Sequence, residues 1–137
     1  MGGRGVRITA DINVLVRGAV RDDPGQTQAA DRVLKNATLI AVSLPCLCEF
    51  AWVLGRVYGF GQAEVATAIR ALLAAANVAT NRPAVEAGLG VLEAGGDFAD
   101  GVIAHEGRWL GAEVFVSFDK QAVKLLSAAG EKAELLA

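Results

Sequence analysis

The stretch TLIAVSLPCLCEFAWVLGRVYGFG, residues 38–61, decides the fold class of this chain. Its first five residues are a run of β-branched and apolar residues that is typical of a short strand. Ser43 stands two positions before Pro45, which is the pattern of a helix cap followed by proline in the first turn. The stretch therefore predicts a strand over 38–42 and a helix that begins near residue 44 and ends at the turn Gly59-Phe60-Gly61.

The alternation of a short strand with a helical segment recurs along the chain. Further strands are predicted over residues 6–10, 77–80, 113–117 and 133–136. Helices are predicted to begin where a capping residue precedes proline, near 24 (Asp22-Asp23-Pro24) and near 83 (Asn81-Arg82-Pro83). A helix over 98–110 should end at Gly111, and the alanine-rich residues 63–79 should pair with the preceding helix as a helical hairpin. Strands joined by helices pair in parallel, so the sequence predicts an α/β fold with a central parallel sheet of four to five strands flanked by helices.

The composition is that of a globular protein. Of 137 residues 53% are hydrophobic, and 13 Lys and Arg stand against 15 Asp and Glu, for a formal net charge of −2. A chain of this length buries about two thirds of its unfolded surface, so we expect one domain over 1–137 that needs no disulfide. The longest uncharged run, residues 36–48, is shorter than the roughly 20 residues of a membrane span, so we expect a cytoplasmic protein without membrane contact. Cys46 and Cys48 are expected to be buried free thiols.

Glu49 is the only charged residue between Lys35 and Arg56. Its neighbours are apolar on every face of the predicted helix, so we expect that helix to be largely buried. An unpaired carboxylate in such a place costs several kcal/mol or takes up a proton, so Glu49 should have a cation or strong hydrogen-bond donors as partner. A buried ion pair with Arg17 or Arg56 is one solution, and a metal ion is another.

Other acids stand at the ends of predicted strands and the start of a predicted helix. Asp11 follows strand 6–10, Asp119 follows strand 113–117, and Asp97 and Asp100 lie one turn apart near residue 98. Because ligands of α/β sheets bind at the carboxyl ends of the strands, we expect these acids and Glu49 to converge there. Two carboxylates about 4 Å apart repel by roughly 4 kcal/mol at an effective dielectric near 20, so the cluster needs a counter-charge. Oxygen ligands alone favour Mg²⁺ or Mn²⁺.

Each of these acids also has a purely structural interpretation. Asp11, Asp97 and Asp119 could cap the helices that they precede, and Asp119 could pair with Lys120. The predicted metal site therefore rests on the joint pattern and not on any one acid.

Four motifs in this order resemble the PIN-domain family, most closely the VapC-type ribonuclease toxins of bacterial toxin–antitoxin pairs. They are ITADINVLVR (8–17) with RDDPGQ (21–26), LPCLCEFAWVLGRVYGF (44–60), GGDFADGVIA (95–104) and VFVSFDKQAVKL (114–125). They cover nearly the whole chain. The resemblance implies a PIN-like three-layer sandwich, in which helices cover both faces of a parallel sheet, with Mg²⁺ or Mn²⁺ in an acidic cluster.

Carried over by position, the resemblance assigns catalytic and metal-binding roles to Asp11, Glu49, Asp100 and Asp119. Asp97 matches a frequent acidic position beside the third of these and is added as a metal ligand. Asn13 and Ser117 match polar positions that support the cluster. Ile12 departs from the family, which commonly has Thr or Ser there, and this removes a hydroxyl group without changing a ligand.

The activity implied by the resemblance is endonucleolytic hydrolysis of RNA by a metal-activated water, as the toxin of a toxin–antitoxin pair. The implied partners are RNA, an antitoxin protein that covers apolar surface, and a second copy in a homodimer. Without the five acids the formal net charge changes from −2 to +3. Cations that could bind RNA phosphates are Arg17, Arg21 and Arg56, with Arg32 and Lys35.

Other functions agree less well with the residues. A phosphatase with an aspartyl nucleophile would need an acid two residues after Asp11, where Asn13 stands. A phosphoacceptor receiver domain would need an Asp after the strand 77–80, and none follows it. A catalytically silent PIN-like module that binds RNA or protein is the remaining alternative, against which the full set of acids argues.

Overall fold

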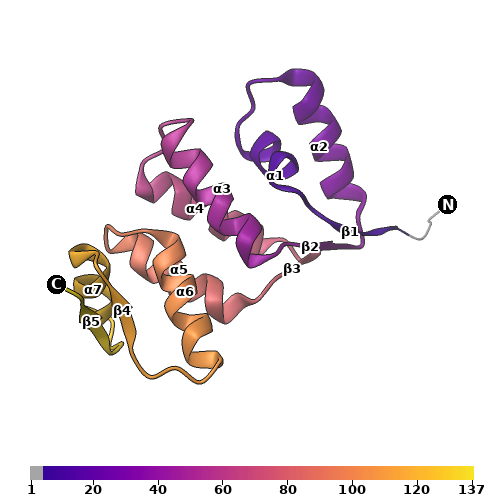
Figure 1. Ribbon diagram of the computed structural model, residues 1–137. Coiled ribbons are helices and arrows are strands. Elements are labelled where there is room, and N and C mark those ends of the chain that lie inside the picture. Colours follow the sequence, from indigo (N-terminus) through magenta and orange to yellow (C-terminus); the bar gives the residue numbers. More distant parts are fainter. Residues whose placement is uncertain (1–4) are drawn as a thin grey trace. The chain divides into compact units, whose positions relative to one another are not determined.

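The computed structural model describes residues 5–137, which form two compact units that meet in sequence at Thr80 and Asn81 (Figure 1). In chain order the first unit contains β1 (Arg7–Thr9), α1 (Ile12–Ala19), α2 (Pro24–Asn36), β2 (Leu39–Ala41), α3 (Leu44–Arg56), α4 (Gln62–Ala74) and β3 (Val78–Ala79). The second contains α5 (Arg82–Glu93), α6 (Phe98–Trp109), β4 (Phe115–Ser117), α7 (Lys120–Ala128) and β5 (Ala133–Leu135). That the two units make one domain stays a prediction.

The first unit is built on a parallel sheet in the order β1-β2-β3. Ile8 lies opposite Ile40, and Ile40 lies opposite Val78. Because two helices separate each strand from the next, the chain returns to the same end of the sheet, and parallel pairing follows. All predicted strands and helices of this unit are present.

The predicted helix starts are confirmed down to their capping hydrogen bonds. Asp23 accepts from the backbone N–H of Gln26, Ser43 from that of Cys46, and Asn81 from that of Ala84. The three bonds have the same physical reason: each capping side chain satisfies an amide that the first helical turn leaves without a partner. Each such cap contributes about 1 kcal/mol to helix stability.

The helices α3 and α4 pack on each other as the predicted hairpin. The turn between them contains Gly59 with φ 71°, a left-handed conformation that favours glycine. The prediction that α3 is largely buried is wrong, because its buried side chains lie on one stripe: Leu44, Leu47, Phe50 and Leu54. Trp52 is 56% exposed, and Glu49 is also exposed.

In the second unit α5 and α6 pack closely, and β4 and β5 form a parallel pair joined by α7. The largest fully buried side chains of this unit are those of Val85, Leu89, Phe98 and Val102. A Cβ atom on Gly101 would lie 2.3 Å from the carbonyl oxygen of Ala87, so glycine at this position permits the close approach of α6 to α5.

The mixed α/β class with parallel strands is confirmed, but the predicted central sheet of four to five strands is wrong. The described residues form one three-stranded and one two-stranded sheet. Local patterns identify a strand, whereas the choice of its neighbour depends on packing distant in sequence. The three-layer arrangement stays a prediction. Among residues 5–137 no helix has both the length and the apolar character of a membrane span.

Candidate functional site

Two of the predicted acids lie in the first unit and line one pocket. Asp11 occupies the cap position of α1, yet its side chain makes no capping hydrogen bond. Glu49 is exposed on α3. Both line a pocket of about 320 Å³, whose walls also include Thr9, Ser43 and Cys46. The end of β1 and the first turns of α3 thus present two carboxylates to one water-accessible space.

The Cys46 thiol reports the charge of this pocket. It donates a hydrogen bond to the carbonyl oxygen of Ala10 at 3.6 Å. Burial raises the pKa of the Cys46 thiol, and the negative charges of Asp11 and then Glu49 raise it further. Both carboxylates therefore act on the same thiol. Cys46 and Cys48 are not joined in a disulfide, as predicted, but both are half-buried and not fully buried.

Glu49 does not have the ion-pair partner that the sequence suggested. Arg17 pairs with Asp22 instead, and within residues 5–137 no Lys or Arg pairs with Glu49. Its exposure to solvent removes the need for one, because water hydrates the carboxylate in place of a protein cation. Glu49 is therefore available as a ligand.

The other three acids lie in the second unit. Asp97 occupies the cap position of α6 without a capping hydrogen bond, and Asp100 lies in its first turn. Asp119 does cap α7: its Oδ1 atom accepts from the N–H groups of Gln121 at 2.9 Å and Ala122 at 3.1 Å. The Ser117 hydroxyl accepts from the N–H of Asp119 at 3.0 Å, which fixes the backbone that carries this acid.

Asp100 is the half-buried member of this group. Burial raises the pKa of the Asp100 carboxyl, and the charges of Asp97 and then Asp119 raise it further. The three acids are therefore close enough in the second unit to affect one another. Such repulsion destabilises the folded chain unless a cation or a proton neutralises it.

We expect Asp100→Asn to raise the melting temperature at pH 7 in metal-free buffer. When the pKa of a carboxyl group is raised in the folded state, the folded chain becomes less stable as the pH rises. The loss begins at the unfolded-state pKa, about 3.9, and is complete above the folded-state pKa. The gain should therefore disappear below about pH 3.9, where Asp100 is protonated in both states. Thermal unfolding as a function of pH measures this gain in melting temperature. The matched control is Glu134→Gln, because Glu134 is exposed on β5. A gain that is the same at every pH would contradict the explanation.

The donor chemistry of both acidic groups suits a hard divalent cation. The acids offer only oxygen atoms, which are the ligands of Mg²⁺ and Mn²⁺. Neither unit contains, among the residues described, three Asp, Glu, His or Cys side chains grouped closely enough to hold a metal by themselves. Mg²⁺ commonly keeps several waters and binds through one or two carboxylates plus substrate phosphates, so pairs of carboxylates are adequate ligands.

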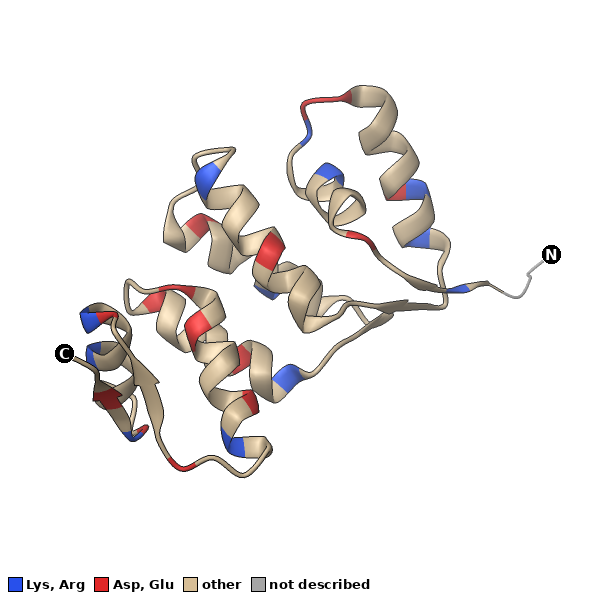
Figure 2. Cartoon of the chain, in the orientation of Figure 1, with Lys and Arg blue, Asp and Glu red and all other residues tan. Residues whose placement is uncertain are grey.

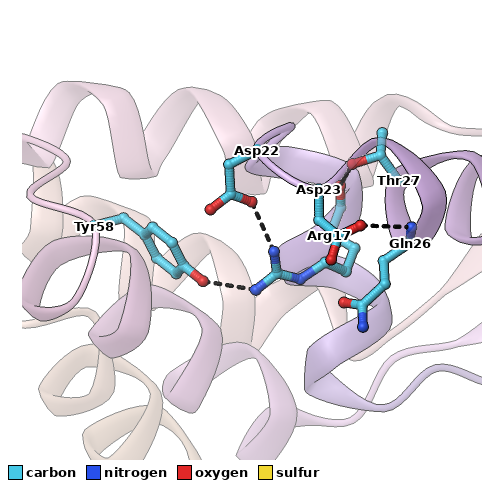
Figure 3. A network of polar contacts seen from close by, with 6 residues as sticks. All are labelled: Arg17, Asp22, Asp23, Gln26, Thr27 and Tyr58. Atoms are coloured by element: carbon cyan, nitrogen blue, oxygen red, sulfur yellow. Dashed lines mark hydrogen bonds and ion pairs between the residues drawn. The ribbon is translucent and has the colours of Figure 1, made fainter.

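Two of the predicted RNA-binding cations have structural roles in the first unit. Figure 3 shows Arg17 donating to Asp22 and to the Tyr58 hydroxyl, both at 2.7 Å, which ties α1 to the end of α3. Arg21 makes a two-point ion pair with Asp31 on α2. Arg56 is exposed and has no ion-pair partner within residues 5–137. Their contact with RNA stays a prediction, and Arg56 has the charge most available for it.

Sequence reasoning missed three polar residues of the first pocket. The sequence patterns identify Thr9, Ser43 and Cys46 only as strand, cap and core residues, whereas in the structure they line the space beside Asp11 and Glu49. A signal was available for Cys46, which precedes Glu49 by three residues and so lies on the same side of α3. Of the predicted supporting residues, Ser117 is described above, and Asn13 is exposed in the first turn of α1.

No protein-family model matches the sequence, and no curated protein matches it. Among solved structures the chain is similar to the crystal structure of VapC20 from Mycobacterium tuberculosis, which is described as a sarcin-ricin loop cleaving toxin. The match covers 90% of this chain and 95% of that one, at 19% identity and a TM-score of 0.43. Similarity at this level does not assign an activity to this chain.

Proposed function

We propose that this chain is a metal-dependent endoribonuclease of the PIN-domain type, acting as the toxin of a toxin–antitoxin pair. The observation that carries the proposal is the pocket in which Asp11 and Glu49 face one space. Neither carboxylate is used by a helix cap or an ion pair within the described residues. Asp11 follows a parallel strand at its carboxyl end, where ligands of α/β sheets bind, and two carboxylates without structural partners there favour a binding function.

In this proposal the acids are metal ligands and position the water. The proposed ligands are Asp11, Glu49, Asp100 and Asp119, with Asp97 as a further one. Asp119 can do so while capping α7, because both capping bonds use Oδ1 and leave Oδ2 for a metal ion. Burial and the neighbouring negative charges raise the pKa of Asp100, and a bound cation would offset both effects. A bound Mg²⁺ or Mn²⁺ would lower the pKa of a water and offset charge developing on the phosphate.

An antitoxin protein and a second copy of the chain are the proposed partners. The first unit has an apolar groove of about 490 Å³, with Leu15, Leu34 and Phe60 among its lining residues, that a protein segment could cover. Trp52 and Val57 are 56% and 62% exposed, as expected of side chains that a dimer buries. Apolar surface of this kind supports an interaction, and the family resemblance supplies the identity of the partners.

The test is cleavage of a cellular RNA pool by the purified chain, with Mg²⁺, with Mn²⁺ and with chelator. Internal cleavage that needs either metal and stops on chelation would support the proposal. RNA binding without cleavage under any metal would favour the alternative, a catalytically silent binding module.

Metal binding can also be measured without RNA, through the thiol of Cys46. In a Cys48→Ser background we expect Mg²⁺ to lower the pKa of Cys46, because the cation cancels the negative charges that raise it. Asp11→Asn should also lower the pKa of Cys46, without any metal. The ultraviolet absorbance of the thiolate as a function of pH gives both midpoints. Metal binding in this pocket would be contradicted if Mg²⁺ did not shift the midpoint of Cys46 in the Cys48→Ser chain. The same conclusion would follow if Mg²⁺ shifted it equally after replacement of both Asp11 and Glu49.

A further inference from the structure

A group of exposed cations lies in the first unit, away from the acids. Arg7 begins β1, and Arg32 and Lys35 lie near the end of α2. All three are exposed, and none has an ion-pair partner within residues 5–137. Figure 2 shows positive segments on β1 and on α2. We call Arg7, Arg32 and Lys35 the basic patch.

Backbone contacts bring the members of the basic patch together. The N–H of Thr38, just after α2, donates to the carbonyl oxygen of Val6, just before Arg7, at 3.0 Å. The chain leaving α2 is therefore bonded to the chain entering β1. Arg32 and Lys35 are three residues apart on one helix, and so lie on the same side of it.

The end of α2 is fixed in place by Asn77. Its amide donates to the carbonyl oxygens of Leu34 and Ala37, both at 3.0 Å. These bonds occupy carbonyls that a helix end otherwise leaves to solvent. The backbone that carries Arg32 and Lys35 is therefore held in place by hydrogen bonds. No acid described in the first unit forms an ion pair with the basic patch.

The strand β1 connects the basic patch to the acidic pocket. Arg7 and Thr9 lie on the same side of β1, because side chains alternate along a strand, and Thr9 lines the pocket of Asp11 and Glu49. At about 3.3 Å per residue, Arg7 and Asp11 are separated by about 13 Å along the chain. A strand of nucleic acid can span that distance, whereas a single phosphate cannot.

We propose that the basic patch binds the phosphate backbone of single-stranded RNA whose cleaved bond lies at the acidic pocket. This rests on the proposed nuclease function and names a substrate-binding surface for it. Three exposed cations without partners keep their full charge for a polyanion, and binding releases the counterions of the phosphates that they neutralise. Contacts to phosphates carry no sequence information, so the patch supplies affinity and positions the strand without sequence preference.

The test measures binding in chelator, so that no RNA is cut. The probe is a fluorescently labelled polyuridine oligonucleotide, titrated with the full chain at several KCl concentrations. Replacing Arg7, Arg32 and Lys35 together by Gln should reduce the slope of log K against log[KCl] by about 2, because single strands contribute about 0.7 per phosphate contact. Affinity near 0.1 M salt should then fall by about 10- to 100-fold. The matched control replaces Arg82, Lys124 and Lys132, which are also exposed, by Gln.

Each outcome separates the patch from the nuclease function. A large loss with the patch variant and a small one with the control supports the patch, whether or not the chain cuts RNA. Equal losses, an unchanged slope, or no RNA binding by the parent at low salt would overturn it. Under metal, the patch variant should raise KM for RNA and leave kcat near the parent value. Metal-dependent cleavage with no change in KM would leave the nuclease proposal standing and remove the patch.

Discussion

Glu49→Gln is expected to lower the rate of metal-dependent RNA cleavage by more than about 100-fold while the chain stays folded. Changes that only affect the orientation of metal ligands already cost about 10- to 100-fold, and this one removes a proposed ligand charge. Glu49 is exposed and has no ion pair within the described residues, so the substitution breaks no contact that holds α3. Circular dichroism should therefore show a nearly unchanged melting temperature, because exposed substitutions of this kind change the free energy of unfolding by at most about 0.5 kcal/mol.

The matched control for this experiment is Glu106→Gln on α6. Glu106 is exposed and belongs to neither acidic group, so it tests the loss of one negative charge alone. Asp11→Asn should behave as Glu49→Gln does, because both carboxylates line the same pocket. Full cleavage activity in both pocket variants would show that these acids do not take part in the reaction. A comparable loss with Glu106→Gln would show an effect of overall charge.

Gly101→Ala is expected to destabilise the second unit by about 2–3 kcal/mol, as overpacked sites do. The added Cβ would lie 2.3 Å from the carbonyl oxygen of Ala87 and 2.7 Å from the Cα of Gly88. These are backbone atoms of α5, and they can give way only if the two helices move apart. Urea unfolding followed by circular dichroism measures the loss. Because Asp100 is the adjacent residue, a shift of α6 should also lower cleavage.

Gly90→Ala on α5 provides an opposite expectation for the same chemical change. A Cβ at Gly90 meets no atom within 4 Å, and the position is exposed. Alanine favours the helix interior over glycine by about 0.8–1.0 kcal/mol, so this variant should be more stable than the parent. If both substitutions lower the free energy of unfolding by the same amount, the close packing of α5 and α6 is not the reason for glycine at position 101.

Much of the local structure was predictable because its causes are short-range. Asp23, Ser43 and Asn81 each satisfy an amide within three residues, and each precedes a proline suited to a first helical turn. Parallel pairing of β1 with β2 likewise follows from the helices between them. The number of strands in one sheet was not predictable in this way, because local patterns do not say which strand edges meet.

The candidate site shows the same division. Sequence alone identified the five acids and the oxygen-rich chemistry that suits Mg²⁺ or Mn²⁺, since these depend on residue type. Their roles as metal ligands and the convergence of all five stay predictions. The sequence could not show that the side chain of Asp119 caps its helix whereas those of Asp11 and Asp97 do not, because the choice depends on a rotamer and a local turn.

By itself the sequence determined the order of strands and helices, the position of helix caps and the supply of acidic oxygen ligands. Only the tertiary structure decided which side of α3 is buried, so that Glu49 lies in solvent and needs no ion pair. It also placed Cys46 beside two carboxylates and occupied Arg17 and Arg21 in structural contacts. The physical reason is that burial and pairing are properties of neighbours in space, which periodicity within one segment does not specify.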